Sequence, residues 1–383
     1  MRQTTKFYLT SFLKNQTYFT PILILFLQLN HLNYQEIFWI FTIASIFSFI
    51  IEIPTGIFAD LYGKKKSIII SKFGIFMSYV LFGFSRNFWM FLLSQLLFEL
   101  GNSFRTGTET AYVFDYLNQN RDVPSYTEVK GKQKFYARIS EAGASAASGF
   151  IAKIFGYHWA FFAAAVPAFL NILIALSWED IKETKQKITY HKTLVHAKQS
   201  VCELCRKKNL LIVTLNIMIF TATLAALQKF IQPYMTDANI PVQWFGVLYS
   251  LFLTLAAIAG RYSYMLEEKF GTKSTINFIS LFAVLPVLIL GFGHVSLIGV
   301  FLFFVVIIIE NIRSPIVNNE FHDLVKSKQR ATMGSILELT KSVGKVVVLP
   351  VAGYVADKFS IYTAVLLMGI ILAINGIILR IKK

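Results

Sequence analysis

The segment Glu52–Ser67, EIPTGIFADLYGKKKS, is the end of a long apolar run that changes character within a few residues. A carboxylate and a proline stand in its apolar part, and Asp60, a second glycine and three lysines follow. An apolar helix that stops at a cluster of lysines is typical of a membrane span that reaches the aqueous surface. The segment therefore predicts a membrane protein.

The composition of the whole chain agrees with this prediction. Of the 383 residues, 55% are hydrophobic and 15% charged, and the mean hydropathy is +0.56, too apolar for a soluble domain. Apolar runs of about 20 residues, each able to cross a ~30 Å hydrocarbon core as a helix, recur throughout. We predict an all-α integral membrane protein with twelve spans, near residues 6–29, 36–59, 67–85, 88–116, 134–155, 157–178, 210–234, 243–264, 274–293, 296–322, 332–356 and 361–380.

The formal net charge of +16 indicates topology and not a nucleic-acid partner. The basic residues lie between the apolar runs, on alternate loops, and they do not form a face studded with aromatic residues. The positive-inside rule then places both termini and the long central segment in the cytoplasm. A composition rich in Lys, Ile, Phe and Asn indicates an AT-rich bacterial genome, so we expect a monomer in the bacterial inner membrane.

The two halves of the chain repeat each other. A shift of 208 residues places Asp60–Lys65 over Glu268–Lys273 and Arg105 over Arg313. Such a repeat is typical of transporters in which two halves move about a substrate site near the bilayer midplane. The predicted parts are an N-terminal six-helix bundle, a cytoplasmic linker and a C-terminal six-helix bundle, at residues 1–178, 179–209 and 210–383.

The stretch from Gly56 to Lys65 resembles a loop signature of the major facilitator superfamily, Gly-x-x-x-Asp-(Arg/Lys)-x-Gly-(Arg/Lys)-(Arg/Lys), although Leu61 stands where the family prefers a base. The stretches Glu52–Gly56 and Phe104–Ala111 also resemble bacterial members. The resemblance implies twelve helices in two bundles and transport by alternating access. It also implies a gate that keeps the cytoplasmic side closed in one state, formed by Gly56, Asp60, Gly63, Lys64 and Lys65.

Polar and charged residues inside the spans are the candidates for binding and coupling. An ionised side chain that faces lipid costs on the order of 3 kcal/mol, so these residues should line water or pair with each other. In the fourth span a polar stripe contains Glu99, Asn102, Ser103, Thr106 and Thr110, and Arg105 and Glu109 are spaced so that they can pair. The other candidates are Lys14, Glu141, Lys229, Gln232, Glu310, Arg313, Glu320, Glu338 and Lys341.

Two interpretations of these charges stay open. Arg105 with Glu109, and Glu338 with Lys341, could be structural pairs that only satisfy each other. Alternatively, the excess of bases over acids in the spans suits an anionic ligand, and Glu99 or Glu310 is the carboxylate that binds and releases protons.

The predicted function is secondary active transport of a small organic solute, coupled to protons. The loop signature favours efflux, but the fifth span, around Glu141–Gly149, lacks the Gly-Pro motif that proton antiporters of the family carry. The alternative is a transporter of an organic anion or siderophore in either direction, and a less favoured one is a membrane receptor. We expect no enzyme activity, no cofactor and no metal site, since Cys202, Cys205, His191 and His196 are too loosely spaced.

Overall fold

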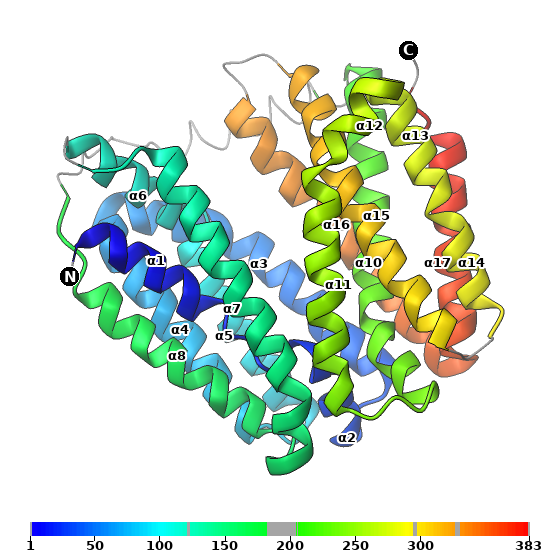
Figure 1. Ribbon diagram of the computed structural model, residues 1–383, viewed down its shortest axis with the longest axis horizontal. Helices are drawn as coiled ribbons and strands as arrows, with labels where there is room; N and C mark the ends of the chain where they lie inside the picture. Colours follow the sequence, from blue (N-terminus) through cyan, green and yellow to red (C-terminus); the bar gives the residue numbers. More distant parts are fainter. Residues whose placement is uncertain are drawn as a thin grey trace. The chain divides into compact units, whose positions relative to one another are not determined.

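The computed structural model describes residues 2–120, 123–181, 204, 206–293, 297–325 and 330–381, which form helices and loops with no strand (Figure 1). The chain forms two compact units. Unit 1 comprises Met1–Leu32, Ile46–Ile188 and Pro241–Ser250, and unit 2 comprises Asn33–Ser45, Thr189–Ile240 and Leu251–Lys383. Helices α3 (Tyr34–Tyr62) and α11 (Gln243–Arg261) contribute residues to both units. The division of the chain at residues 178 and 210 stays a prediction.

Unit 1 is built around α4. This helix packs on α5 and α8, and α1 packs on α7 and α8 (Figure 1). Side chains start two of the helices: the Asn87 side chain accepts a hydrogen bond from the Met90 N–H before α5, and Ser125 does so from the Glu128 N–H before α7. The helices of unit 1 are α1 (Gln3–Lys14), η1 (Thr20–Ile22), α2 (Leu23–Leu29), α4 (Lys64–Phe84), α5 (Phe88–Arg105), α6 (Thr108–Gln119), α7 (Tyr126–Phe155) and α8 (Trp159–Leu176).

The closest approach of α4 and α5 depends on Gly101. A Cβ atom at this position would lie 2.8 Å from the carbonyl oxygen of Ser71, so the two backbones can meet only at a glycine. An aromatic cluster packs in another part of unit 1, where the ring of Phe7 contacts the rings of Tyr112 and Trp178 in edge-to-face geometry. The helices of unit 1 are therefore held by small-residue contacts and by aromatic packing.

Two of the predicted spans are broken in unit 1. The predicted span 6–29 consists of α1, η1 and α2, and the chain leaves helical geometry after Lys14, before Pro21 starts the next turn. The predicted span 88–116 consists of α5 and α6, separated at Thr106 and Gly107. Gly107 has a φ of +75°, which a glycine adopts readily and which ends a regular helix. The polar stripe predicted along one continuous fourth helix is therefore interrupted.

Unit 2 contains the second set of helices. Helix α10 contacts α15, α16 and α17, and α13 and α14 contact α15 and α17 (Figure 1). The backbone N–H groups of Tyr34 and Gln35 donate to the Asp357 carboxylate at 2.9 and 2.6 Å, which caps the start of α3 within this unit. The remaining helices are α10 (Lys208–Asp237), α12 (Ser263–Phe270), α13 (Thr272–Phe282), α14 (Val284–Gly291), α15 (Leu297–Asp323), α16 (Arg330–Lys358) and α17 (Ile361–Ile378).

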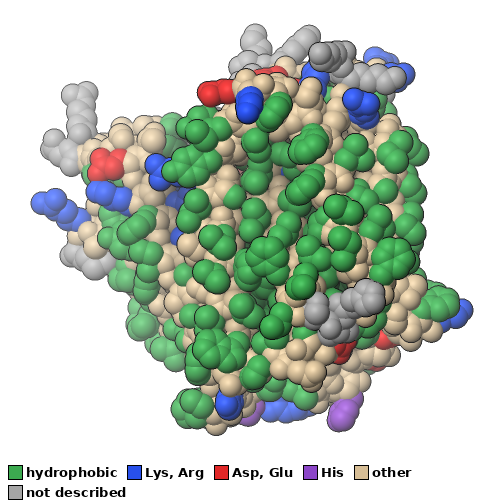
Figure 2. All heavy atoms as spheres, turned by 45° about the vertical axis from the view of Figure 1, so that its right-hand side comes forward, with side chains coloured by type: hydrophobic (Ala, Val, Ile, Leu, Met, Phe, Trp, Pro, Cys, Tyr) green, Lys and Arg blue, Asp and Glu red, His purple; other side chains and the backbone are tan. Residues whose placement is uncertain are grey.

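The helices have the length and surface of membrane spans. Eight helical stretches in the described part of the chain are long and apolar enough to cross a membrane. Each predicted span coincides with one helix or with consecutive helices. Figure 2 shows hydrophobic side chains over most of the face that it presents, and large apolar residues such as Phe278 and Ile377 are exposed. The all-α membrane fold predicted from the sequence is confirmed.

Candidate functional site

Two adjoining cavities in unit 1 are lined by basic and polar side chains. Their volumes are about 240 and 440 Å³, and both are lined by Lys14, Asn15 and Arg105. The first also contacts Thr17, Lys72, Tyr79, Phe98 and Asn171, and the second also contacts Glu109, Thr110, Lys130 and Lys134. The cavities thus lie among α1, α4, α5, α6, α7 and α8, which come from sequence segments far apart.

The carboxylate of Glu109 is shared by two ammonium groups. Its Oε2 atom lies 3.5 Å from Lys72 Nζ and 3.8 Å from Lys14 Nζ. The side chains of Lys72 and Glu109 are only 3% and 9% exposed, yet neither Lys72 Nζ nor Glu109 Oε2 has a hydrogen-bond partner among the described residues. These separations are longer than an N–H···O hydrogen bond. Electrostatic attraction therefore holds the three groups together, and Lys72 Nζ keeps hydrogen-bonding capacity that a ligand could use.

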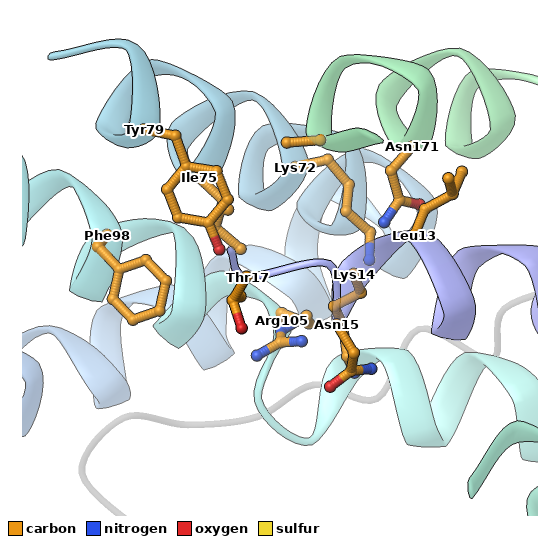
Figure 3. A pocket seen from close by; sticks show the side chains of 11 residues that line it. Leu13, Lys14, Asn15, Thr17, Lys72, Ile75, Tyr79, Phe98, Arg105 and Asn171 are labelled. Carbon is orange, nitrogen blue, oxygen red and sulfur yellow. The ribbon is translucent and has the colours of Figure 1, made fainter. Parts of the chain in front are cut away.

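The breaks in the helices place these groups in the cavity. Lys14 is the last residue of α1, Arg105 the last of α5, and Glu109 lies in the first turn of α6. In Figure 3, the Lys72 side chain and the Tyr79 hydroxyl are directed toward the part of the pocket where Lys14 and Arg105 lie. A continuous fourth helix would separate Arg105 and Glu109 by only one turn on the same face.

The sequence suggested that Arg105 and Glu109 pair with each other, but in the structure each of them contacts other residues. The Arg105 guanidinium donates to Asn102 Oδ1, and Glu109 pairs with Lys14 and Lys72. The reason is the break at Thr106 and Gly107, which turns α6 away from the line of α5. Elsewhere on α5, Glu99 accepts a hydrogen bond from Gln95 Nε2 at 3.0 Å.

In unit 2, Arg313 is a buried hydrogen-bond centre. It is 1% exposed, its Nε donates to Ser280 Oγ at 2.9 Å, and its NH2 donates to Asn216 Oδ1. The guanidinium also lies 3.9 Å from the centre of the Phe220 ring, and Glu310 Oε2 is 3.9 Å from its NH1. Arg313 therefore links α15 to α13 and α10.

The other predicted residues have separate local partners. Glu141 accepts from Arg138 at 2.7 Å and Glu338 from Lys341 at 2.7 Å. Lys229 Nζ lies 3.4 Å from the centre of the Phe41 ring, and Gln232 is buried. Of the predicted set, the structure thus brings together Lys14, Asn102, Arg105 and Glu109 in unit 1, and it pairs Glu310 with Arg313 and Glu338 with Lys341 in unit 2.

The sequence interpretation missed Lys72, Tyr79, Asn171 and Lys130, which line the cavities. The sequence could have indicated Lys72 as a candidate site residue. It is a base inside the predicted span 67–85, where an unpaired charge is costly. The described residues contain no group of three or more His, Cys, Asp or Glu side chains that could hold a metal ion. Cys202 and Cys205 lie outside the described residues.

The loop between α3 and α4 is pinned by ion pairs. Gly63, with a φ of +101°, makes the reversal; Lys64 then pairs with Asp115 of α6, and Lys65 Nζ lies 3.0 Å from Asp180 Oδ1. In unit 2, Gly271 has a φ of +77° at the corresponding reversal, but Lys273 lies 3.8 Å from Glu320 of α15 and not from an acid in the chain after α17. Asp60 is exposed.

Sequence comparison identifies the family. The profile of the Major Facilitator Superfamily matches residues 8–319. The chain belongs to the Major Facilitator Superfamily. A relative in Bacillus subtilis (strain 168), the uncharacterized MFS-type transporter YxaM, is 21% identical over 362 residues, which are 93% of this chain and 89% of the relative. The family resemblance inferred from Gly56–Lys65 is confirmed.

Solved transporters share the fold. The nucleoside transporter NupG superposes with a TM-score of 0.83 at 15% identity, covering 99% of this chain and 100% of NupG. A D-xylose–proton symporter has a TM-score of 0.77 at 10% identity, with coverage of 98% and 96%. These likenesses show the fold, and membership of the Major Facilitator Superfamily makes this chain a multi-pass membrane transporter of a secondary-transporter family.

The hydrogen bonds of Arg313 predict a structural role for this residue. Arg313→Lys keeps the charge but cannot reproduce both hydrogen bonds and the stacking on Phe220, so we expect a loss of about 2–3 kcal/mol in unfolding free energy. Thermal unfolding of the detergent-purified protein measures it. Arg138→Lys, at an exposed ion pair, is the control and should unfold like the wild type. Equal stability of both variants would contradict the structural role.

Proposed function

We propose that the protein is a secondary active transporter of a small organic anion, which binds to Lys72, Lys14 and Arg105. The main support for this proposal is the charge of the two adjoining cavities. Five basic residues, Lys14, Lys72, Arg105, Lys130 and Lys134, and one acidic residue, Glu109, line them. A cavity with this charge attracts anions and disfavours cations.

The buried ammonium of Lys72 supports a carboxylate as the bound group. Lys72 Nζ has no hydrogen-bond partner among the described residues, and a carboxylate oxygen would accept a charge-assisted hydrogen bond from it. The cavity wall also contains Ile75 and Phe98, which suit an apolar portion of the solute. Two structural neighbours, a POT family transporter in complex with 5-aminolevulinic acid, which carries a carboxylate, and the peptide transporter POT in complex with sulfate, support a solute with a carboxylate or another anionic group.

Competition for the lysines supports proton coupling through Glu109. A bound carboxylate and the Glu109 carboxylate would face the same two ammonium groups, and like charges repel strongly in a poorly solvated site. A proton on Glu109 removes that repulsion, so the anion and a proton would occupy the site together. Glu99 and Glu310 are supported less as carriers, because neither lines the two cavities that Lys14 and Arg105 share.

The gating role of Gly56, Asp60, Gly63, Lys64 and Lys65 is part of the proposal. The support is the pair of Lys64 with Asp115, which ties the loop to α6, the helix that carries Glu109. A conformational change in the loop would therefore be transmitted through α6 itself, from Asp115 to Glu109 in the first turn of this helix. The same cavity would serve uptake or efflux. We also propose that the protein is a monomer in the inner membrane with both termini in the cytoplasm.

Replacement of Lys72 tests anion binding. In Lys72→Gln, solute counterflow in proteoliposomes should fall by roughly 10- to 100-fold for the transported anion, since a charge-assisted hydrogen bond is lost. The probes are labelled small carboxylates, with a nucleoside and a pentose as neutral comparisons. Lys66→Gln, on the same helix but exposed, is the matched control. The proposal would be contradicted if the protein exchanges a neutral probe and Lys72→Gln leaves that exchange unchanged. A membrane receptor that does not transport would show no counterflow of any probe.

Replacement of Glu109 tests proton coupling. Glu109→Gln should keep counterflow but lose accumulation driven by a pH gradient, while Glu109→Asp, which can still carry a proton, should retain part of it. Gradients imposed in both directions report uptake or efflux. If only Glu99→Gln or Glu310→Gln abolishes the response to the gradient, Glu109 is not the carrier.

The gating loop gives a further prediction. Asp60→Asn should lower the transport rate by about fivefold relative to Lys66→Gln, which corresponds to the loss of one attraction of ~1 kcal/mol between the Asp60 carboxylate and the Lys64 ammonium. Initial rates in proteoliposomes measure this difference. Equal rates in the two variants would favour a loop that serves topology alone.

A further inference from the structure

A cavity in unit 2 lies outside the site described above. Its volume is about 540 Å³, and it is bounded by the first turns of α13 and by the chain that follows α17, two helices that run side by side (Figure 1). One part of its wall is polar and basic and the other is apolar, formed by Lys273, Ser274, Asn277 and Arg380, and by Phe278 and Leu281.

Hydrogen bonds fix the basic part of this wall. Asn277 Nδ2 donates to the Ile381 carbonyl at 2.9 Å, and the Ile381 N–H donates to Asn277 Oδ1 at 3.0 Å. This pair attaches the segment after α17 to α13, so that Arg380 lines the same cavity as Lys273. On its other side, Lys273 lies 3.8 Å from the carboxylate of Glu320.

Unit 1 has an ion pair at the corresponding place. The shift of 208 residues that relates the two halves places Lys65 over Lys273. After α8, the chain of unit 1 brings Asp180 to Lys65 at 3.0 Å, whereas after α17 the chain of unit 2 brings Arg380, a second base. Two positive charges that face one cavity repel each other, and an anion between them turns this repulsion into attraction.

The apolar part of the wall continues along the outside of the helices. Phe278 is 68% exposed and Leu281 43% exposed, and Phe282, Leu285 and Ile378 are also exposed on α13, α14 and α17. In a membrane protein such side chains face acyl chains. A free inorganic anion would use only the basic part of this cavity, whereas a lipid uses both parts.

We propose that this cavity binds one anionic phospholipid, with its phosphate between Lys273 and Arg380 and an acyl chain along Phe278 and Leu281. Basic side chains at the membrane surface attract anionic headgroups, and the long apolar stem of each base can lie against the chains. The lipid supplies in unit 2 the negative charge that Asp180 supplies to Lys65 in unit 1.

Charge reversal of Arg380 tests the proposal. Native mass spectrometry of the delipidated full chain with added phosphatidylglycerol or phosphatidylcholine measures the affinity for each lipid. We expect Arg380→Gln to weaken phosphatidylglycerol binding by roughly fivefold and Arg380→Asp by roughly 30-fold, because two units of charge change. Arg380→Asp also offers Lys273 the kind of partner that Lys65 has, so the fold should be retained.

A reciprocal variant and two controls complete the experiment. Asp180→Arg should create a phosphatidylglycerol site in unit 1, and Lys358→Gln, an exposed base that does not line the cavity, should bind this lipid like the wild type. Unchanged phosphatidylglycerol binding in Arg380→Asp would overturn the proposal. Displacement of the lipid by millimolar inorganic phosphate would overturn the lipid as occupant and leave an anion site.

Discussion

The interaction of the buried Glu109 carboxylate with the buried ammonium of Lys72 and the half-buried ammonium of Lys14 is the constraint on which the interior of unit 1 depends. An ionised group among apolar helices is costly unless an opposite charge lies close to it, and Glu109 supplies that charge to Lys72 and Lys14. Because one anion serves two cations, the cluster keeps a net positive charge. The cavity is therefore stable without a ligand and still attractive to an anion, a combination that a fully neutralised cluster would lack.

The helix breaks make this cluster possible. The last turn of a helix favours a cation and the first turn favours an anion, because of the partial charges of the unpaired backbone groups. Lys14 and Arg105 lie in the last turns of α1 and α5, and Glu109 lies in the first turn of α6. In continuous spans these side chains would lie in helix interiors, without help from the helix ends. The breaks thus lower the cost of placing three charges around one cavity.

Much of the fold could be predicted from the sequence, because apolar runs and basic loops follow from the bilayer itself. The family signature at Gly56–Lys65 could be recognised because it combines a glycine at a chain reversal with adjacent lysines. The breaks were not readable, since Gly107 lies in a run that continues a helical pattern on both sides. The partners of Glu109 and Arg313 were not readable either, because Lys72, Ser280 and Asn216 come from distant helices. Local spacing favoured Arg105 for Glu109, and tertiary packing supplied two lysines instead.

The sequence repeat shows why the two units differ in chemistry. The shift of 208 residues that aligns Arg105 with Arg313 also aligns Lys72 with Ser280 and Glu109 with Val317. In unit 2 the serine accepts a hydrogen bond from Arg313, and a single base is satisfied by neutral partners and an aromatic ring. In unit 1 Lys72 adds a buried cation near the half-buried Arg105, and a carboxylate becomes necessary. Two divergent positions therefore distinguish the closed structural centre of unit 2 from the charged cavity of unit 1, and this difference supports the proposal that the substrate binds in unit 1.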